Sequence, residues 1–403
     1  MLEVTDLTTP GSAPGCTSQC PVRGGCEEIQ MNNVAKKNIT VEEIKAAHIQ
    51  AVTSQKFEPV MVHELFGFST PLKGFEKPIP VPAERHPLSP SVDSNYVFNE
   101  SLVRRVLLSM ATKDSIMLVG EKGTGKSSLI NQINGRLNRP SIAINAGPGV
   151  DEGYLVGFRT LGKDGVKSVD GVLSYAYRHG LSCTIDEICS LNPGVLLSLN
   201  DILQGDEVVT LKHHGIDPEL DPRELLGLEG GMNIVRHPSF RLFATDNTGG
   251  KSSRDPRYAG TKGQNAAVRS RFTSFKANFM SAEKEMAALH GLNTGVDDLN
   301  IQLMVEFAFR FRVAFSQEEA FDNISFRELK RWVTKMALYD DLDESFVDAI
   351  YGNLEEADQA LARELFDETF DRDLVLPEEY TTSVADQLDA LTKAAVSNAA
   401  QIA

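Results

Sequence analysis

The residues with the clearest chemistry form a glycine-rich stretch in the first third of the chain. It reads Gly120-Glu121-Lys122-Gly123-Thr124-Gly125-Lys126-Ser127 and is followed by Ser128. This order fits the pattern G-x-x-x-x-G-K-[ST] at every fixed position. Glycines let backbone N–H groups surround phosphate oxygens, Lys126 brings a positive charge to the β- and γ-phosphates, and the Ser127 hydroxyl is a ligand for Mg²⁺. The stretch predicts a site for ATP and Mg²⁺; the alternative is an ordinary glycine turn.

The flanking residues favour the nucleotide site over the turn. An unbroken apolar run, Ile116 to Val119, precedes the glycines and is typical of a strand buried on both faces. Apolar residues then recur at helical spacing from Leu129 to Leu137, which predicts a helix that begins near Lys126. A strand, a glycine loop and a helix N-terminus therefore occur in the order that a phosphate site needs.

Two acidic residues follow another apolar run. Leu181 to Ile185 predicts a buried strand, and Asp186 and Glu187 come directly after it. In open α/β sheets ligands collect at the carboxyl ends of the strands, where these acids would lie. Asp186 would hold Mg²⁺, directly or through water, and Glu187 would orient and polarise the attacking water. The alternative is that the acids cap a helix.

An amide residue has the same relation to a further strand. Phe240 to Thr245 predicts a strand that ends in Asp246 and Asn247. The Asn247 amide could hold the hydrolytic water opposite Glu187, although alone it would be a turn residue. The catalytic candidates from these motifs are Lys126, Glu187 and Asn247, and the magnesium ligands are Ser127 and Asp186.

The remaining pattern predicts an α/β fold that positions these residues. Strands are expected at 116–119, 141–144, 181–185, 240–245 and 274–279, a small hairpin near 166–171, and two strands at 207–211 and 233–236 around an acidic insert at 213–231. Helices are expected at 40–52, 100–112, 126–137, 173–177, 193–204, 281–290, 297–316, 324–339 and 343–370. Prolines make 58–92 an extended strap with few hydrogen-bonded elements, and residues 249–264 are expected to be mobile.

We expect five segments along the chain. They are a flexible Cys-containing tail (1–38), an N-terminal helix and proline-rich strap (39–94), a nucleotide-binding core (95–280), a helical lid (281–370) and a C-terminal tail or helix (371–403). The length of 403 residues is consistent with more than one domain.

Composition limits the classes of function. The net charge of −16 argues against a nucleic-acid surface that covers the whole chain, so nucleic acid is an unlikely partner. No apolar run approaches membrane-spanning length and the N-terminus shows no signal pattern, so a cytoplasmic location is the default expectation.

The five cysteines form two groups. Cys183 and Cys189 are expected to be small hydrophobic residues near a core strand. Cys16, Cys20 and Cys26 cluster in the tail, where they are free thiols or hold a metal with a fourth ligand from elsewhere. The free-thiol interpretation is favoured because no standard zinc pairing is present.

The order of these motifs resembles the AAA+ ATPases. Within them the chain resembles the MoxR branch, and most closely the CobS-like ATPase subunits of aerobic cobaltochelatases. The residues that carry the resemblance, which covers roughly 60–340, are Val62-His63-Glu64-Leu65-Phe66-Gly67, Asn95-Tyr96-Val97-Phe98, Gly123 to Ser127, Asp170-Gly171-Val172-Leu173 with Ala176-Tyr177, His237-Pro238 before Phe240 to Thr245, Asn247-Thr248, and Tyr258-Ala259-Gly260-Thr261 before Arg271-Phe272. It implies a three-layer αβα core with a parallel five-stranded sheet, followed by a helical lid.

The resemblance also implies roles for single residues. Asn247 matches sensor 1, and Arg271 matches the arginine finger that reaches the γ-phosphate bound to a neighbouring subunit. Arg327, in Ser325-Phe326-Arg327, matches the sensor 2 arginine of the lid and would contact the nucleotide. A surface salt bridge is the alternative for each arginine.

Three other arginines are alternatives to Arg271 as the finger, and two positions differ from the family pattern. Arg254, Arg257 and Arg269 are close rivals for the finger. Ser270 stands where the family often has Asp, and Asp246 stands where a small residue usually precedes the sensor Asn. Neither departure touches the core chemistry.

Two functional hypotheses are compatible with the sequence. The first is a ring-forming, ATP-hydrolysing motor, usually a hexamer in this family, with a von Willebrand factor A-domain partner (CobT-like), that remodels a protein or drives metal insertion. The hairpins near 166–171 and 207–236 would be the family insertions that face partners or the pore. The second is a slow nucleotide-dependent switch or binding module that could act on nucleic acid, and the salt dependence of binding would separate the two.

Overall fold

The computed structural model describes residues 40–162, 165–211, 214, 232–248, 266–377 and 380. The predictions for the tail 1–38 with its three cysteines, for most of the insert 213–231 and for 249–264 with Arg254 and Arg257 lie outside these residues. The same holds for nearly all of 371–403 beyond Pro377.

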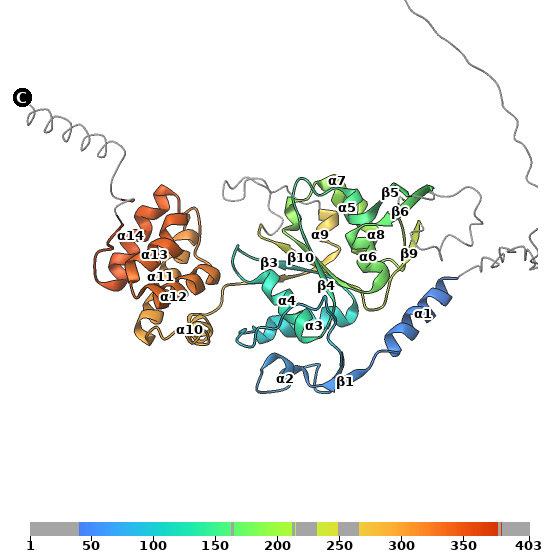
Figure 1. Ribbon diagram of the computed structural model, residues 1–403, viewed down its shortest axis with the longest axis horizontal. Coiled ribbons are helices and arrows are strands. Elements are labelled where there is room, and N and C mark those ends of the chain that lie inside the picture. Colours follow the sequence, from blue (N-terminus) through green and yellow to red (C-terminus); the bar gives the residue numbers. More distant parts are fainter. Residues whose placement is uncertain are drawn as a thin grey trace, which may run out of the picture. The chain divides into compact units, whose positions relative to one another are not determined.

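A parallel five-stranded sheet is the centre of the nucleotide-binding core (Figure 1). Its strands are β3 (Ser115–Val119), β4 (Ser141–Asn145), β7 (Ser182–Asp186), β10 (Arg241–Asp246) and β11 (Phe272–Lys276). Their order is β11-β3-β10-β7-β4, and every neighbouring pair is parallel. Because all strands run the same way, the ends of β3, β7 and β10 meet at one edge, which confirms the α/β prediction.

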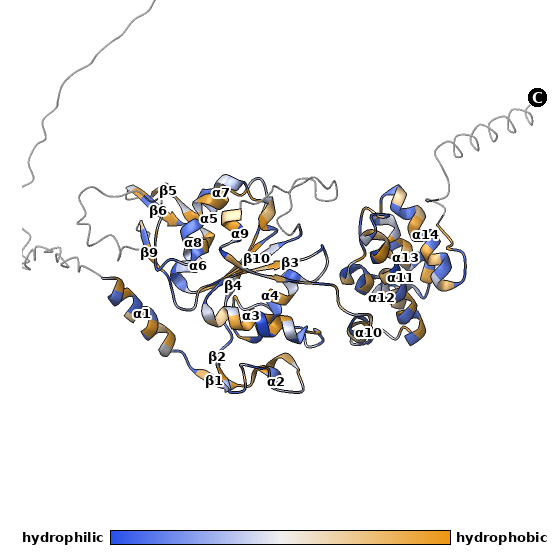
Figure 2. Ribbon diagram, turned by 180° about the vertical axis from the view of Figure 1, so that it is seen from behind, coloured by the Kyte–Doolittle hydropathy of each residue, from blue (hydrophilic) through white to orange (hydrophobic). Residues whose placement is uncertain are grey.

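Helices cover both faces of this sheet. On β3, Ile116 and Leu118 pack in a cluster with helices α3 (Glu100–Thr112) and α4 (Lys126–Arg136), whereas Met117 packs in the opposite cluster. Phe243 of β10 shares the first cluster and Leu242 shares the second. This alternation is the period of two that a strand imposes on its side chains. Figure 2 shows the matching mixture of hydrophobic and hydrophilic residues on α3.

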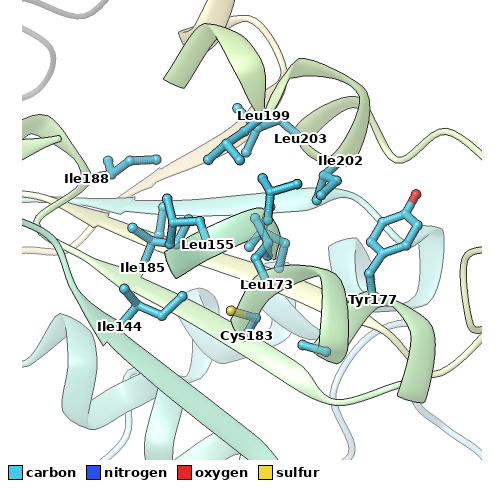
Figure 3. Packing of buried hydrophobic residues seen from close by; sticks show 14 of the residues in the cluster. Ile144, Leu155, Leu173, Tyr177, Cys183, Ile185, Ile188, Leu199, Ile202 and Leu203 are labelled. Carbon is cyan, nitrogen blue, oxygen red and sulfur yellow. The ribbon is translucent and has the colours of Figure 1, made fainter. Parts of the chain in front are cut away.

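The second face carries four short helices. They are α5 (Glu152–Val156), α6 (Val172–His179), α7 (Pro193–Ser198) and α8 (Asn200–Gln204). Figure 3 shows Leu155, Leu173 and Ile202 from these helices, with Leu199 from the junction of α7 and α8, packed near Ile185 of β7. The core is therefore the three-layer αβα arrangement that the resemblance implied.

The proline-rich strap contains more regular structure than predicted. The helix α1 (Val41–Thr53) begins with a Thr40–Glu43 capping box, as the sequence indicates. Beyond it, β1 (Phe57–Val60) pairs antiparallel with β2 (Ile79–Pro82), and α2 (Val62–Phe66) lies between them in sequence. The expectation of few hydrogen-bonded elements was wrong because a two-stranded ribbon leaves outward-facing positions where a proline needs no N–H donor.

Two hairpins extend the core. β5 (Gly157–Gly162) pairs antiparallel with β6 (Gly165–Asp170), so the hairpin is longer than the segment 166–171 and its first strand was not predicted. β8 (Val208–Thr210) pairs with β9 (Asn233–Val235) as expected. Leu161 and Val166 lie directly opposite each other on the first hairpin and are 84% and 64% exposed.

Some elements of the core differ from the predictions. The helix expected at 193–204 is interrupted at Leu199, whose ψ of 0° departs from helical geometry while its side chain stays buried. The last strand is 272–276 rather than 274–279, because Phe272 already pairs with Ser115. A 3₁₀ turn (Ile188–Ser190) follows β7, and the short helix α9 (Ala266–Arg269) precedes β11.

The C-terminal part described is helical, as predicted. It contains α10 (Ala282–His290), α11 (Asp298–Ser316), α12 (Phe326–Tyr339), α13 (Leu342–Ala349), a 3₁₀ turn (Tyr351–Asn353) and α14 (Glu356–Phe370). The single helix expected at 343–370 is therefore wrong. Its interruption has a packing reason, since Ile350 leaves helical geometry (φ −130°) and is buried in the same cluster as Trp332.

No helix among the described residues is long and apolar enough to cross a membrane.

Candidate functional site

The glycine loop between β3 and α4 requires glycine at three positions for structural reasons. Gly123 and Gly125 have φ of +84° and +79°, a region that costs a residue with a Cβ about 1–2 kcal/mol. A Cβ at Gly120 would overlap the carbonyl of Ala277, and one at Gly123 would overlap the Ser325 side chain. The glycines thus shape the loop and allow its close neighbours to approach.

Lys126 lies at the start of α4 with 6% of its surface exposed. Its Nζ donates hydrogen bonds to the carbonyls of Gly120 (2.9 Å) and Glu121 (2.8 Å), so the ammonium is held beneath the loop. Burial lowers the pKa of Lys126, and the nearby carboxylates of Glu121, Asp246, Glu187 and Asp186 oppose that shift. A phosphate group at the loop would supply the counter-charge that these carbonyl dipoles provide only in part.

Ser127 and Asp186 are brought together from the loop and from the end of β7. The Ser127 hydroxyl donates to Asp186 Oδ1 at 2.6 Å. One hydroxyl and one carboxylate suit Mg²⁺, which takes few protein oxygen ligands and completes its shell with phosphate oxygens and water. No group of three His, Cys, Asp or Glu side chains that could hold a metal occurs within the described ranges. The residues therefore fit a nucleotide-bound magnesium ion.

Glu187 is held at both its backbone and its side chain. It has φ +53° and ψ +48°, so the chain turns away from the sheet at this residue. Its N–H donates to Thr245 Oγ1 at 2.9 Å, and its Oε1 accepts from Asn247 Nδ2 at 3.1 Å. The side chain of Asn247 therefore lies directly beside the carboxylate of Glu187, the residue predicted to activate water.

These side chains line a cavity of about 380 Å³. Its lining is Lys122, Gly123, Gly125, Lys126, Ser127, Ser128, Asn145, Ala146, Asp186, Glu187, Thr245, Asn247, Asn323, Ser325, Arg327 and Glu328. Gly120, Glu121 and Thr124 belong to the loop without lining the cavity, and Thr124 Oγ1 bonds the Glu121 carbonyl instead. The cavity thus unites the loop, both acids, Asn247 and Arg327.

Sequence reasoning missed six residues of this lining, namely Asn145, Ala146, Thr245, Asn323, Ser325 and Glu328. Asn145 pairs with Asp186 across β4 and β7, and Thr245 lies on β10 two residues before Asn247, which follows that strand. Ser325 and Glu328 form the capping box of α12, in which the Ser325 N–H donates to Glu328 at 2.6 Å, and Asn323 precedes it by two residues. The capping signal was visible in the sequence, but its position beside the loop was not.

Arg271 does not line this cavity. It is half-buried after α9, its Nη1 donates to the Ala267 carbonyl, and its Nε has no hydrogen-bond partner among the described residues. Arg269, a rival on the same helix, is exposed.

The departure at Asp246 has a structural role. Its side chain is 1% exposed, and Oδ1 accepts from the Thr248 N–H (2.7 Å) and hydroxyl (2.8 Å). Asp246 therefore closes the turn that follows β10. This turn carries Asn247, so Asp246 supports the position of Asn247.

Residues 115–272 match the family model of an AAA domain (dynein-related subfamily). The chain is 27% identical to the aerobic cobaltochelatase subunit CobS of Sinorhizobium sp over 320 residues, which are 77% of this chain and 90% of the relative. It is 26% identical to protein CbbQ of Hydrogenophilus thermoluteolus over 52% of this chain and 70% of the relative. A solved structure of a Thermotoga maritima RuvB mutant matches 70% of this chain and 81% of that chain, with 15% identity and a TM-score of 0.42. The sequence matches confirm the resemblance to AAA+ ATPases of the MoxR and CobS type.

Proposed function

We propose, from the premise that residues 115–272 form an AAA domain, that this chain is an ATP-hydrolysing motor that assembles into a ring. The observation that carries the proposal is the shared cavity of Lys126, Ser127, Asp186, Glu187 and Asn247. Each side chain has the type and position that phosphoryl transfer to water needs. ATP with Mg²⁺ supplies the phosphoryl group and the charge neutralisation.

The residues divide the work between binding and catalysis. Lys126 and the N–H groups at the start of α4 bind the β- and γ-phosphates. Ser127 and Asp186 would hold a magnesium ion, which would supply charge neutralisation for the phosphates. Glu187 orients a water molecule for in-line attack, and Asn247 bonds the same carboxylate at 3.1 Å, so the water and the γ-phosphate are positioned by one hydrogen-bonded group.

Our proposal of a ring is supported by the placement of Arg271. This residue lies outside the cavity of its own chain, and its Nε is without a partner in the described part of the protein. We infer that it reaches the cavity of a neighbouring copy and stabilises the charge that develops on the γ-phosphate. A head-to-tail contact of this kind closes into a ring when the rotation between copies allows it.

Mixing two inactive variants tests this arrangement. Glu187→Gln removes the water-orienting carboxylate, and Arg271→Ala removes the finger. In a 1:1 mixture about one quarter of the contacts combine an intact cavity with an intact finger from the neighbour, if subunits assort at random. We expect each variant alone to hydrolyse little ATP and the mixture to recover about a quarter of the wild-type rate.

The controls separate the possible failures. The same mixture with Arg269→Ala in place of Arg271→Ala tests the rival arginine. A mixture without recovery, with both variants shown to form rings with ATP, would contradict a finger supplied in trans. A wild-type chain that binds ATP as a monomer and does not hydrolyse it would instead favour the slow switch.

The work done by the motor is a further part of the proposal. CobS and CbbQ are the named relatives, and we propose that this chain acts with a partner protein of the von Willebrand factor A-domain type to remodel a protein or to drive metal insertion. The exposed apolar side chains of the β5–β6 hairpin, Leu161 and Val166, suit such a contact. The Glu187→Gln variant with bound ATP would serve as the bait that isolates the partner. Adding Leu161→Ser and Val166→Ser to this bait should weaken capture of the partner.

The alternative function is a nucleotide-dependent switch on nucleic acid. Binding to DNA should weaken steeply between 50 and 200 mM salt, as counterion release requires, by about 10³-fold or more. Binding to a protein partner need not show that dependence.

A further inference from the structure

A threonine hydroxyl joins the two acidic residues of the cavity. Thr245 lies on β10 with 1% of its surface exposed. Its Oγ1 donates to Asp186 Oδ1 at 2.8 Å and accepts the Glu187 N–H at 2.9 Å. The Thr245 side chain therefore contacts the Asp186 carboxylate, the proposed magnesium ligand, and the backbone N–H of Glu187 at the same time.

The direction of both hydrogen bonds is fixed by chemistry. An ionised carboxylate only accepts, a backbone N–H only donates, and a hydroxyl has one proton and two lone pairs. The Thr245 proton must therefore point to Asp186, and a lone pair must receive the Glu187 N–H. Ser127 donates to the same Asp186 Oδ1 at 2.6 Å, so two hydroxyl groups set the orientation of this carboxylate.

The bond to Glu187 has a backbone reason. Glu187 has φ +53°, a conformation that costs a non-glycine residue about 1 kcal/mol or more and takes its N–H away from the hydrogen bonds of the sheet. The preceding Asp186 still pairs, since its carbonyl accepts the Ala146 N–H at 2.9 Å. Thr245 is the group that receives the N–H of Glu187 at the turn, and so it fixes where the Glu187 side chain starts.

Thr245 on β10 and Asn247, in the turn directly after β10, both hold Glu187. Thr245 bonds the Glu187 backbone and Asn247 bonds its carboxylate. The backbone of Glu187 is thereby fixed while the carboxylate has a partner that a water molecule or a phosphate could replace.

We propose that Thr245 is a positioning residue for ATP hydrolysis, which links the orientation of Asp186 to that of Glu187. The inference rests on the proposed ATPase function. The Thr245 hydroxyl contacts Asp186 and Glu187. This role does not require Thr245 to touch the reacting atoms. Loss of the hydroxyl should therefore slow hydrolysis and weaken the response to Mg²⁺ far more than it weakens nucleotide binding.

The test compares three variants of the full chain. Thr245→Val keeps the shape and removes the hydroxyl, and Thr245→Ser restores it. Thr273→Val is the matched control, because Thr273 Oγ1 on strand β11 also donates to a carboxylate (Asp114 Oδ2, 3.1 Å), yet Thr273 does not line the cavity. The measurements are kcat and KM for ATP, the Mg²⁺ concentration for half-maximal rate, and binding of a fluorescent ATP analogue without magnesium.

We expect kcat to fall about 10–100-fold in Thr245→Val, as for other residues that orient metal-binding groups. The Mg²⁺ requirement should rise, whereas analogue binding without magnesium should change by less than about threefold. Thr245→Ser should recover most of kcat, and Thr273→Val should stay close to wild type. General destabilisation of Thr245→Val would not give these results, since it would weaken analogue binding as well.

Two outcomes would overturn the proposal. One is wild-type kcat in Thr245→Val; the other is an equal loss of kcat and of magnesium-free analogue binding, without rescue by Ser. A wild-type chain that hydrolyses no ATP would instead refute the proposed function, so the two failures are distinguishable. Circular dichroism melts of each variant show whether a variant that loses both properties is folded.

Discussion

The buried ion pair between Glu285 and Arg312 should be costly to break and inexpensive to replace. Arg312 Nη1 lies 2.9 and 3.0 Å from the two carboxylate oxygens of Glu285, which is 0% exposed. Burial raises the pKa of Glu285 and lowers the pKa of Arg312, while each charge opposes the shift of the other. Both directions indicate that desolvation outweighs the attraction within the pair.

The perturbation is Glu285→Leu, which leaves the Arg312 charge buried without its partner. Breaking a buried pair in this way costs about 3–5 kcal/mol, whereas replacing both partners by apolar residues is often neutral. The double variant Glu285→Leu/Arg312→Met also loses the bond from Arg312 Nε to the Ile324 carbonyl (2.6 Å), worth about 1 kcal/mol. We therefore expect the double variant to lie within about 1–2 kcal/mol of wild type.

The assay uses the single tryptophan of the chain. Trp332 is 0% exposed and packs in the same helical cluster as Phe307 and Phe346, so its fluorescence reports unfolding of this part of the protein. With a urea dependence of about 2 kcal/mol per molar, Glu285→Leu should lower the midpoint by about 2 M. Glu306→Leu is the control, because Glu306 is 42% exposed in its pair with Arg310 and should cost less than about 1 kcal/mol.

Two results would refute this reasoning. A midpoint for Glu285→Leu that equals that of Glu306→Leu would mean that the charge on Arg312 finds solvent. A double variant less stable than Glu285→Leu alone would mean that Arg312 without its partner stabilises the fold through its other contacts, so that its buried charge is not the cost. ATP binding provides a second readout, since Ile324 directly precedes Ser325 at the cavity and the single variant should bind ATP more weakly.

Three further predictions concern other groups. Burial and the neighbouring His48 lower the pKa of His237 from 6.5 to about 4, so its neutral form stabilises the fold fully above about pH 6.5 and this contribution is lost toward pH 4; thermal melts of wild type should show that loss and melts of His237→Asn should show less of it. Asp246→Ala should cost about 1–3 kcal/mol because the buried Thr248 N–H loses its acceptor, and Asp246→Asn should cost less, as melts in parallel would show. Burial raises the pKa of Cys183 to about 12 and of Cys189 to about 11, so brief iodoacetamide treatment should modify both only in urea, which peptide mass spectrometry measures.

The core chemistry was predictable because it depends on local patterns. The glycine loop, the acids after β7 and Asn247 after β10 each follow an apolar run, and such runs form strands whose ends meet at one edge of a parallel sheet. Local spacing alone therefore places Lys126, Asp186 and Asn247 near one another. The helix starts at Thr40 and Ser325 were also predictable, since both carry capping boxes.

The missed features depend on long-range packing. Asn145 lines the cavity only because β4 pairs with β7, and nothing in its own neighbourhood indicates that order. The sequence does not mark the break at Leu199, because Leu196, Leu199 and Leu203 have the i, i+3, i+7 spacing of one face of a continuous helix. The strand β5 begins and ends with glycine, so its sequence resembles a loop.

Gly123 is constrained twice, and this limits how the chain can evolve at the loop. A methyl group there would meet residue Ser325, with the Ser325 Oγ at 3.0 Å and the backbone Cα of the same residue at 3.2 Å. A suppressor search with Gly123→Ala should not return Ser325→Gly, because that change removes the side chain but leaves the crowding against the backbone and the strained φ of +84°. Ser325→Gly would relieve only the contact with the side chain and would leave the strained backbone of Gly123→Ala. We therefore expect glycine to be retained at position 123.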